Sequence, residues 1–297
     1  MEQIIIRSVS DYIKSLININ NIIDSKEDYF YKEILFRGQS NEDYTLIPSL
    51  GRYKGGNEDV CHVERNMIEI AKYSFPSVFS NDLEPIELLS LLQHYGIPTR
   101  MLDLTENALV ALFFACNGSP EKNGEVFVFL NRYLDVANFP IVNAIADSYR
   151  LCRGSFYTLD LFYAEIIQQP YFLEQKSMNE AIHKDNLSGG KWISECCNTP
   201  FFVNTSVRIT RQQYQKGRYL LFPNKREKVL DEGPEAFVSE IAPLPKDNEC
   251  IIGKISIPAE YKNEILKEIK ILGIDRKMLF ADSIDITCEE IKKQFFY

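Results

Sequence analysis

The sequence predicts an α+β protein of 297 residues that folds as one domain. The strand signal is clearest at residues 124–130, where β-branched and aromatic residues lie between two turns. The helix signal is clear at residues 261–272, an amphipathic segment that ends at Gly273. No Pro-rich or Ser-rich linker and no internal repeat divides the chain. The economical interpretation is a single domain over residues 1–297.

The N-terminal part of the chain alternates helix and strand patterns. Apolar residues recur at helical spacing after Ser8 or Ser10, either of which is a good N-cap, so segment 1–30 is expected to hold the first helix. A short buried strand that ends at a glycine comes next. The predicted elements are a helix over residues 4–24, a strand over 34–39, a loop over 44–52 and a helix over 58–73.

Arg37 is the unexpected residue of the first predicted strand, because it lies directly after Leu35 and Phe36. An unpaired arginine in apolar surroundings is costly, so we expect Arg37 to be largely buried against a carboxylate or an anionic ligand. Gly38 follows it and would let a backbone or a ligand pass close by. The strand therefore offers a candidate anion site.

A polar turn at residues 96–105 separates two predicted helices. Asp82 is a candidate N-cap for the first helix, and Gly96 supplies a left-handed stop at its end. Thr105 is a candidate N-cap for the second helix, expected over residues 106–116.

We expect this turn to bring Thr99, Arg100 and Asp103 to one place. Two interpretations remain open at this point. The three side chains could form part of a ligand site, or Arg100 and Asp103 could form an ion pair that fastens the turn.

The second half of the chain carries weaker signals. Residues 131–200 show no motif, and we interpret them as an insertion or lid-like segment of the same domain. The expected elements are helices over 157–167 and 174–183, a loop over 188–190, strands over 200–203, 217–223 and 250–258, and a closing helix over 288–296.

The composition is that of an ordinary globular protein, with 45% hydrophobic and 25% charged residues. No run approaches the ~20 apolar residues that a membrane span needs, and residues 1–7 lack the layout of a signal peptide. Seven cysteines without a CxxC spacing favour reduced thiols, so we expect a cytoplasmic protein. Three histidines without ligand spacing make a metal site unexpected.

The net charge of −9 argues against a broad nucleic-acid-binding surface. Residues 208–228 are nevertheless locally basic, with Glu227 as their one acidic residue. Such a strip is compatible with a phosphate-bearing ligand and equally with a solvated hairpin. Its basic members are Arg208, Arg211, Lys216, Arg218, Lys225, Arg226 and Lys228.

The chain contains three motifs: Phe-Arg-Gly-Gln at 36–39, Gln-His-Tyr-Gly-Ile-Pro-Thr-Arg-Met-Leu-Asp-Leu-Thr at 93–105, and Ala-Leu-Phe-Phe-Ala at 111–115. Together they resemble the FRG domain family of bacterial proteins. Later motifs extend the resemblance to about residue 282, so it covers most of the chain. Met101 and Leu104 stand where the family more often has a leucine and an aromatic residue.

The order of these motifs is similar to that of the ADP-ribosyltransferase fold. The resemblance implies a split β core surrounded by helices, with NAD as the substrate. It implies that NAD is bound by Arg37, Gly38, Gln39, His94, Tyr95, Thr99, Arg100 and Phe113 (or Phe114). It gives the catalytic positions to Arg37, Asp103, Thr105 and Gln215, although Gln212 and Gln213 compete with Gln215 for its position.

The function implied by the resemblance is transfer of ADP-ribose from NAD to a macromolecule. FRG-type proteins look like toxins or phage-defence effectors, which implies a toxin–antitoxin arrangement with a cognate antitoxin or inhibitor. The basic strip slightly favours nucleic acid, such as RNA, over protein as the acceptor. Residues 212–222 offer glutamines where such enzymes carry a glutamate, and a glutamine cannot stabilise a cation by charge. The alternatives are a non-catalytic nucleotide or nucleic-acid binding module, and a hydrolase of another kind.

Overall fold

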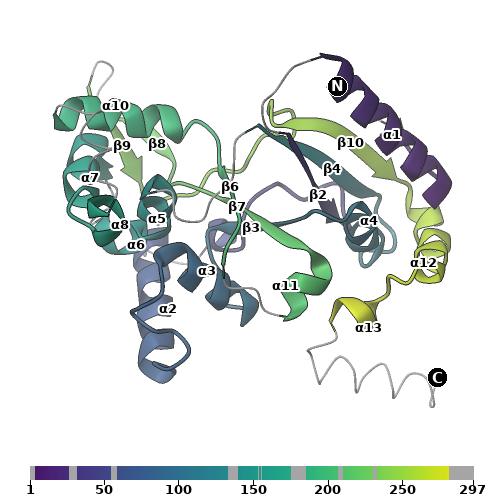
Figure 1. Ribbon diagram of the computed structural model, residues 1–297, viewed down its shortest axis with the longest axis horizontal. Coiled ribbons are helices and arrows are strands. Elements are labelled where there is room, and N and C mark those ends of the chain that lie inside the picture. The colour runs from purple at the N-terminus through teal and green to yellow at the C-terminus, as the bar shows by residue number, and fades with distance from the viewer. Residues whose placement is uncertain are drawn as a thin grey trace.

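The computed structural model describes residues 4–26, 32–54, 59–132, 140–152, 154, 156–174, 185–206, 210–229 and 233–280. The chain is a mixed α/β protein, as the sequence predicts. A seven-stranded sheet crosses the centre of Figure 1, with α1, α4 and α12 beside its right half. A helical region and a small second sheet lie on the left.

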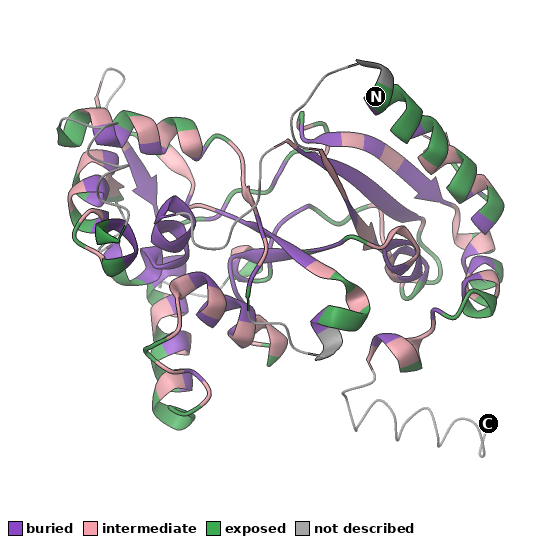
Figure 2. Ribbon diagram, in the orientation of Figure 1, coloured by how far each residue is buried: buried purple, intermediate pink, exposed green. Residues whose placement is uncertain are grey.

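The main sheet is antiparallel except where its first strand pairs parallel with β10. Its strands are, in spatial order, β1 (Ile4–Ile5), β10 (Ile251–Ile257), β4 (Gly124–Asn131), β2 (Glu33–Gln39), β3 (Met101–Thr105), β7 (Gly217–Leu221) and β6 (Phe201–Val203). Figure 2 shows that the central strands are largely buried, since β4 is covered on both faces by apolar side chains.

The sheet has a weak point between β2 and β3. β2 pairs with β4 from Glu33 to Gln39, and β3 pairs with β7 from Met101 to Thr105. Between β2 and β3 the structure registers one pair, Phe36 with Thr105. The two halves of the sheet therefore meet at one position, and their facing edges are otherwise available to other groups.

Three helices cover one face of the sheet around β4 and β10. They are α1 (Val9–Lys26), α4 (Ala108–Cys116) and α12 (Lys262–Ile271), the last preceded by the 3-10 turn η2 (Ala259–Tyr261). Tyr12 Oη donates to the Ala108 carbonyl at 2.9 Å, which ties α1 to α4. The nearly all-apolar sequence of α4 fits its burial between the sheet and these helices.

The opposite face packs on the 3-10 turn η1 (Leu50–Arg52) and on the chain around Leu244, which forms an isolated bridge with Leu46. Phe127 and Phe129 fill the centre of this face, and both are fully buried. Two short helices, α11 (Thr210–Gln215) and α13 (Arg276–Leu279), contact each other near the weak point of the sheet.

The helical region has an apolar cluster of its own, which continues onto β6 and β7. Its helices are α2 (Val60–Ser74), α3 (Pro85–His94), α5 (Pro140–Ala146), α6 (Ser148–Leu151), α7 (Leu159–Ile166), α8 (Pro170–Leu173) and α10 (Asn186–Cys196). The second sheet runs in the order β5 (Phe156–Thr158), β9 (Glu235–Val238) and β8 (Arg226–Lys228). Most of the described residues of segment 131–200 thus pack here as helices.

Several predicted element ends differ from the structure. The first helix begins at Val9, after the short strand β1, and Ser8 Oγ accepts from the Asp11 amide at 3.1 Å as an N-cap does. Asp82 caps no helix, because Pro85 occupies the first turn of α3. Asn107, not Thr105, caps α4 through Leu109 N.

Two further predictions are corrected or fall outside the structure. Gly189 and Gly190 lie inside α10 and not in a loop, because α10 packs closely on α7. A Cβ at Gly189 would lie 2.3 Å from the Tyr163 ring. Most of the helix predicted over 174–183 and the whole helix predicted over 288–296 lie outside the described residues.

Candidate functional site

A cavity of about 260 Å³ opens where β2 and β3 separate. Strands β2, β3 and β7 contribute to its wall, together with the end of α3, one side of α4 and α11. Its polar lining residues are Arg37, Gln93, His94, Asp103, Thr105, Gln212, Gln215 and Tyr219. Five of the predicted site residues therefore meet in one cavity with Gly38: Arg37, His94, Asp103, Thr105 and Gln215.

Arg37 bridges the two halves of the sheet. Its Nη1 donates to the main-chain carbonyl of Asp103 at 2.6 Å, and its buried Nε has no hydrogen-bond partner among the described residues. Burial lowers the pKa of Arg37 to about 10, while the Asp103 carboxylate opposes that shift and the Arg52 charge adds to it. The half-buried guanidinium thus remains charged at neutral pH and keeps a donor for a ligand.

Gly38 is required by packing. A Cβ on Gly38 would lie 1.8 Å from the Ala111 carbonyl oxygen and 2.8 Å from the Ala115 nitrogen, both in the backbone of α4. The sequence analysis expected a backbone segment or a ligand to pass close to Gly38. The structure shows that this segment is α4, which lies against β2 at this glycine. Because α4 also forms one wall of the cavity, Gly38 fixes how closely that wall approaches Arg37.

Asp103 is held in place by a short chain of hydrogen bonds. Gln93 Nε2 donates to Asp103 Oδ1 at 2.6 Å, while Gln93 Oε1 accepts from the hydroxyl of Thr99. The Thr99 hydroxyl in turn accepts from the Met101 amide at 3.2 Å. Thr99 is buried outside the cavity, so it acts on the site through Gln93. Asp103 is the one carboxylate among the described residues that line the cavity.

Thr105 and Gln215 line the cavity while holding its walls together. Thr105 Oγ1 donates to the Gln215 carbonyl at 2.6 Å and accepts from the Asn107 amide at 2.9 Å. The side-chain amide of Gln215 donates to the Leu279 carbonyl at 3.1 Å, which joins α11 to α13. Both side chains are thus engaged with backbone groups of the chain itself.

Gln212 is a further glutamine of α11 on the cavity wall, with 7% of its surface exposed. Its Nε2 donates to Thr205 Oγ1 at 3.2 Å, and its buried Oε1 has no partner among the described residues. Gln213 is exposed and does not line the cavity. The sequence did not show which of these three glutamines belongs to the site, and the structure places Gln212 and Gln215 at the cavity.

Two phenylalanines, Phe36 and Phe114, line the cavity together with the ring of Tyr219. Phe113 lies in the buried cluster around α4, with its ring 5.6 Å from that of Phe114. Tyr95 is exposed and does not line the cavity, and its ring contacts those of His94 and Phe79. Of the predicted aromatic contacts to a ligand, the structure thus favours Phe114 over Phe113 and Tyr95.

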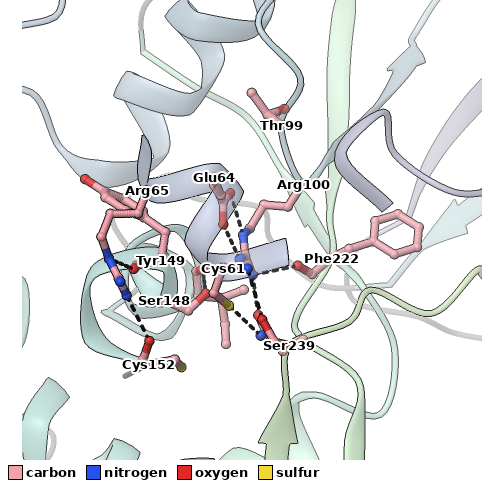
Figure 3. Close-up of polar contacts among 12 residues, drawn as sticks. Cys61, Glu64, Arg65, Thr99, Arg100, Ser148, Tyr149, Cys152, Phe222 and Ser239 are labelled. Carbon is pink, nitrogen blue, oxygen red and sulfur yellow. Dashed lines mark hydrogen bonds and ion pairs between the residues drawn. The ribbon is translucent and has the colours of Figure 1, made fainter. Parts of the chain in front are cut away.

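Arg100 lies away from the cavity, fully buried in an ion pair with Glu64 of α2 (Figure 3). Arg100 Nε and Nη2 both donate to the Glu64 carboxylate, and Nη1 donates to Asn224 Oδ1 at 2.8 Å. Burial works to lower the pKa of Arg100, but Glu64 outweighs it and raises the pKa above its ordinary value. Arg100 therefore fastens β3 to α2 and makes no pair with Asp103.

Gln39 is also placed outside the cavity. Its Nε2 donates to the Tyr44 carbonyl at 2.9 Å and to Glu125 Oε2 at 3.1 Å, where Lys246 and Lys254 also pair with Glu125. This buried network fixes the end of β2. Arg37 is thus the side chain of the Phe-Arg-Gly-Gln motif that brings a charge to the cavity.

The basic strip at 208–228 is partly neutralised within the fold. Arg218 is buried between Glu33 and Glu106, with Nη1 at 3.0 Å from Glu106 Oε1. Lys225 pairs with Glu227 and Glu240. Arg226 pairs with Glu235 at 3.4 Å, and Arg208 lies outside the described residues. The strip therefore gives less support to a nucleic-acid surface than the sequence suggested.

Sequence reasoning did not assign Gln93 or Tyr219 to the site, and it left Gln212 as one of three competing glutamines. Gln93 was visible as the residue that precedes His94 in the long motif, but its bond to Asp103 depends on the turn at Gly96, where φ is +82°. Among the described residues no helix is long and apolar enough to cross a membrane. In the same part of the chain no group of His, Cys, Asp and Glu side chains is arranged to hold a metal ion.

The family comparison covers a segment of the chain that forms part of the cavity wall. The sequence model of the FRG domain matches residues 32–124, which include β2, α3, β3 and α4. No curated protein and no solved structure matched the chain. The matched segment therefore contains Arg37, Gln93, His94 and Asp103, while Gln212, Gln215 and Tyr219 complete the cavity from outside it.

Proposed function

The chain carries an FRG domain over residues 32–124, and from that premise we propose that it is an NAD-dependent ADP-ribosyltransferase. The observation that carries the proposal is the cavity at the gap between β2 and β3, with Arg37 on one strand and Asp103 on the other. A sheet that separates beside a basic residue is what a split β core of the ADP-ribosyltransferase kind requires.

Arg37 is suited to bind the anionic part of NAD. Its guanidinium is charged at neutral pH, and its Nε has no hydrogen-bond partner among the described residues. Charge-assisted hydrogen bonds from arginine to phosphate are among the strongest that a protein makes. The cavity of about 260 Å³ is at the small end of ligand pockets, so we place the nicotinamide and its ribose inside and the remaining nucleotide at the mouth.

Asp103 is suited to stabilise the transition state. When the glycosidic bond breaks, its electron pair leaves with nicotinamide and positive charge develops on the ribose. A carboxylate held beside that charge lowers the barrier, and a fixed carboxylate does so without reorganisation. The hydrogen bond from Gln93 fixes Asp103, so Asp103 takes the place of the glutamate that residues 212–222 lack. The acceptor then bonds to the ribose carbon and releases its proton.

Phe114 offers an aromatic face or edge for the nicotinamide ring, and Phe36 lies on the same cavity wall. The acceptor is a macromolecule in this proposal, and the paired state of Arg218, Lys225 and Arg226 leaves RNA, DNA and protein open. A role as a cytoplasmic toxin or phage-defence effector with a cognate inhibitor follows from the family resemblance alone.

A second candidate function is nucleotide binding without turnover. One observation favours it: residues 212–222 offer no glutamate, and Asp103 is the one carboxylate among the described residues that line the cavity. A module that only binds would hold the same nucleotide and release no nicotinamide.

The direct test is incubation of the purified chain with NAD labelled in its adenylate part, in separate pools of RNA, DNA and protein. Label on one pool together with released nicotinamide supports the transferase. Arg37→Ala should abolish both, whereas Arg7→Ala, which removes an exposed arginine that lies over the Tyr261 ring outside the cavity lining, should not. Tight NAD binding without nicotinamide release from any pool would favour the binding module.

A further inference from the structure

A buried chain of four polar side chains begins and ends at the cavity. Gln212 Nε2 donates to Thr205 Oγ1 at 3.2 Å, Thr205 Oγ1 lies 3.2 Å from Ser90 Oγ, and Ser90 Oγ donates to Tyr219 Oη at 3.4 Å. The exposed fractions are 7% for Gln212, 2% for Thr205, 1% for Ser90 and 6% for Tyr219. The two end members, Gln212 and Tyr219, line the cavity.

The hydroxyl protons of this chain fix which way the Gln212 amide faces. Ser90 has one hydroxyl proton and gives it to Tyr219, so the proton between Ser90 and Thr205 comes from Thr205. Thr205 Oγ1 can then only accept from Gln212, which requires Nε2 on that side. The amide oxygen of Gln212 is consequently held on the other side, where no partner meets it among the described residues.

We propose that Gln212 is a specificity-determining residue, whose Oε1 accepts a hydrogen bond from an N–H or O–H group of the ligand in the cavity. A buried oxygen without a hydrogen-bond partner lowers the stability of the fold. A purely structural role for Gln212 would leave this loss of stability without an explanation. Arg37 supplies a donor to the same cavity and Gln212 supplies an acceptor. The cavity therefore selects a ligand that carries both an acceptor and a donor.

This inference rests on the proposed function for the identity of the ligand. NAD carries two kinds of donor that could meet Gln212, the carboxamide N–H of nicotinamide and the hydroxyls of its ribose. Their shared chemistry is the hydrogen-bond donor, and analogues of NAD separate the two sources. One analogue carries an acetyl group in place of the carboxamide, and another lacks the ribose 2′-hydroxyl next to nicotinamide.

The experiment measures the Kd of the full chain for NAD and for both analogues by calorimetry. Gln212→Leu should weaken NAD binding about tenfold, the loss expected for one well-made hydrogen bond in a buried site. Thr205→Val, which releases the Gln212 amide, should weaken it in the same direction, and Thr205→Ser should restore it. Gln213→Leu, at an exposed neighbour in the same helix, is the control and should change nothing.

One of the two analogues lacks the group that contacts Gln212. That analogue should bind the wild type more weakly than NAD does, and Gln212→Leu should not weaken its binding further. If Gln212→Leu binds NAD as tightly as the wild type, the proposal is overturned. If the wild type does not bind NAD, the proposed function fails. The role of Gln212 is then tested separately by the melting temperature of Gln212→Leu. An unchanged or higher melting temperature for Gln212→Leu supports an oxygen reserved for a ligand, and a drop of about 5 °C or more shows a structural residue and overturns the inference.

Discussion

Breaking the buried ion pair between Glu64 and Arg100 should destabilise the protein far more than any change at the surface. The two side chains have exposed fractions of 1% and 0%, so water cannot replace a lost partner. Glu64→Gln would leave the Arg100 charge with the carbonyl of Phe222 and Asn224 Oδ1. Removing one member of a buried pair typically costs about 3–5 kcal/mol.

That loss corresponds to a decrease in melting temperature of roughly 5–8 °C for a chain of this size. Urea unfolding followed by circular dichroism measures the free energy. The control is Asp43→Asn, which breaks the exposed pair between Asp43 and Lys122 and should have no measurable effect. The double variant Glu64→Leu with Arg100→Met should lose less than Glu64→Gln, because no charge is left without a partner. A Glu64→Gln variant as stable as Asp43→Asn would refute the reasoning.

Three further predictions concern Gly38, Gly96 and Arg37. Gly38→Ala should lower the free energy of unfolding by more than about 3 kcal/mol, because its Cβ meets the backbone of α4 at 1.8 Å. Loss of soluble protein or a large decrease in melting temperature would show this. Gly96→Ala should cost only about 1 kcal/mol, since φ is +82° but nothing lies within 4 Å; a loss as large as that of Gly38→Ala would contradict this. Binding of ADP-ribose should weaken as the pH rises through about 10, where Arg37 loses its proton, and not near the ordinary arginine pKa. Calorimetry between pH 8 and about 11 checks this, and affinity that stays constant over that interval would show that Arg37 does not bind the phosphates.

The same shift in Arg37 fixes the sign of its effect on stability. Between about pH 10 and the ordinary pKa of arginine, the unfolded chain binds a proton that the folded chain has released. The contribution of Arg37 to the free energy of unfolding therefore rises with pH over that interval. Binding and stability thus respond to this one group in opposite directions.

Local sequence patterns were sufficient for five of the seven described strands of the main sheet and for the stop at Gly96. They missed β1, and β3 lies where a polar turn over residues 96–105 was predicted. Residues 34–39, 124–130 and 250–258 carry β-branched and aromatic residues between turns, and each holds a strand of the main sheet. The unusual arginine in the first of these strands was expected to meet a carboxylate or an anionic ligand, and Arg37 instead donates to a main-chain carbonyl at the cavity. Its burial is only partial, because the cavity exposes part of the side chain.

The partners of several predicted site residues depend on contacts between segments that are distant in the sequence, so the sequence could not show them. Arg100 and Asp103 are three residues apart, but Met101 begins a strand, so the two side chains leave it in different surroundings. The partner of Arg100 is Glu64, on another helix, and no local pattern connects them. Gly189 and Gly190 read as a loop, whereas the close packing of α10 on α7 explains glycine within a helix.

The roles of the glutamines likewise depend on tertiary contacts. Gln212, Gln213 and Gln215 are equivalent in the sequence, and only the position of α11 turns the first and the last toward the cavity. The role of Gln93 depends on its hydrogen bond to Asp103, which forms because the chain turns at Gly96 after α3 and β3 returns beside that helix.

The measurement that tests the central claim most directly is nicotinamide release from NAD by Asp103→Asn. Asparagine keeps an oxygen for the Gln93 amide and removes the charge, so the fold and NAD affinity should persist. The account predicts that kcat falls about 10²–10³-fold, as for the loss of one preorganised electrostatic group, with an unchanged melting temperature. Glu106→Gln is the matched control, because Glu106 pairs with Arg218 outside the cavity lining, and it should keep most of the activity. A variant Asp103→Asn with wild-type kcat, or one that loses activity only in proportion to its stability, would contradict the account.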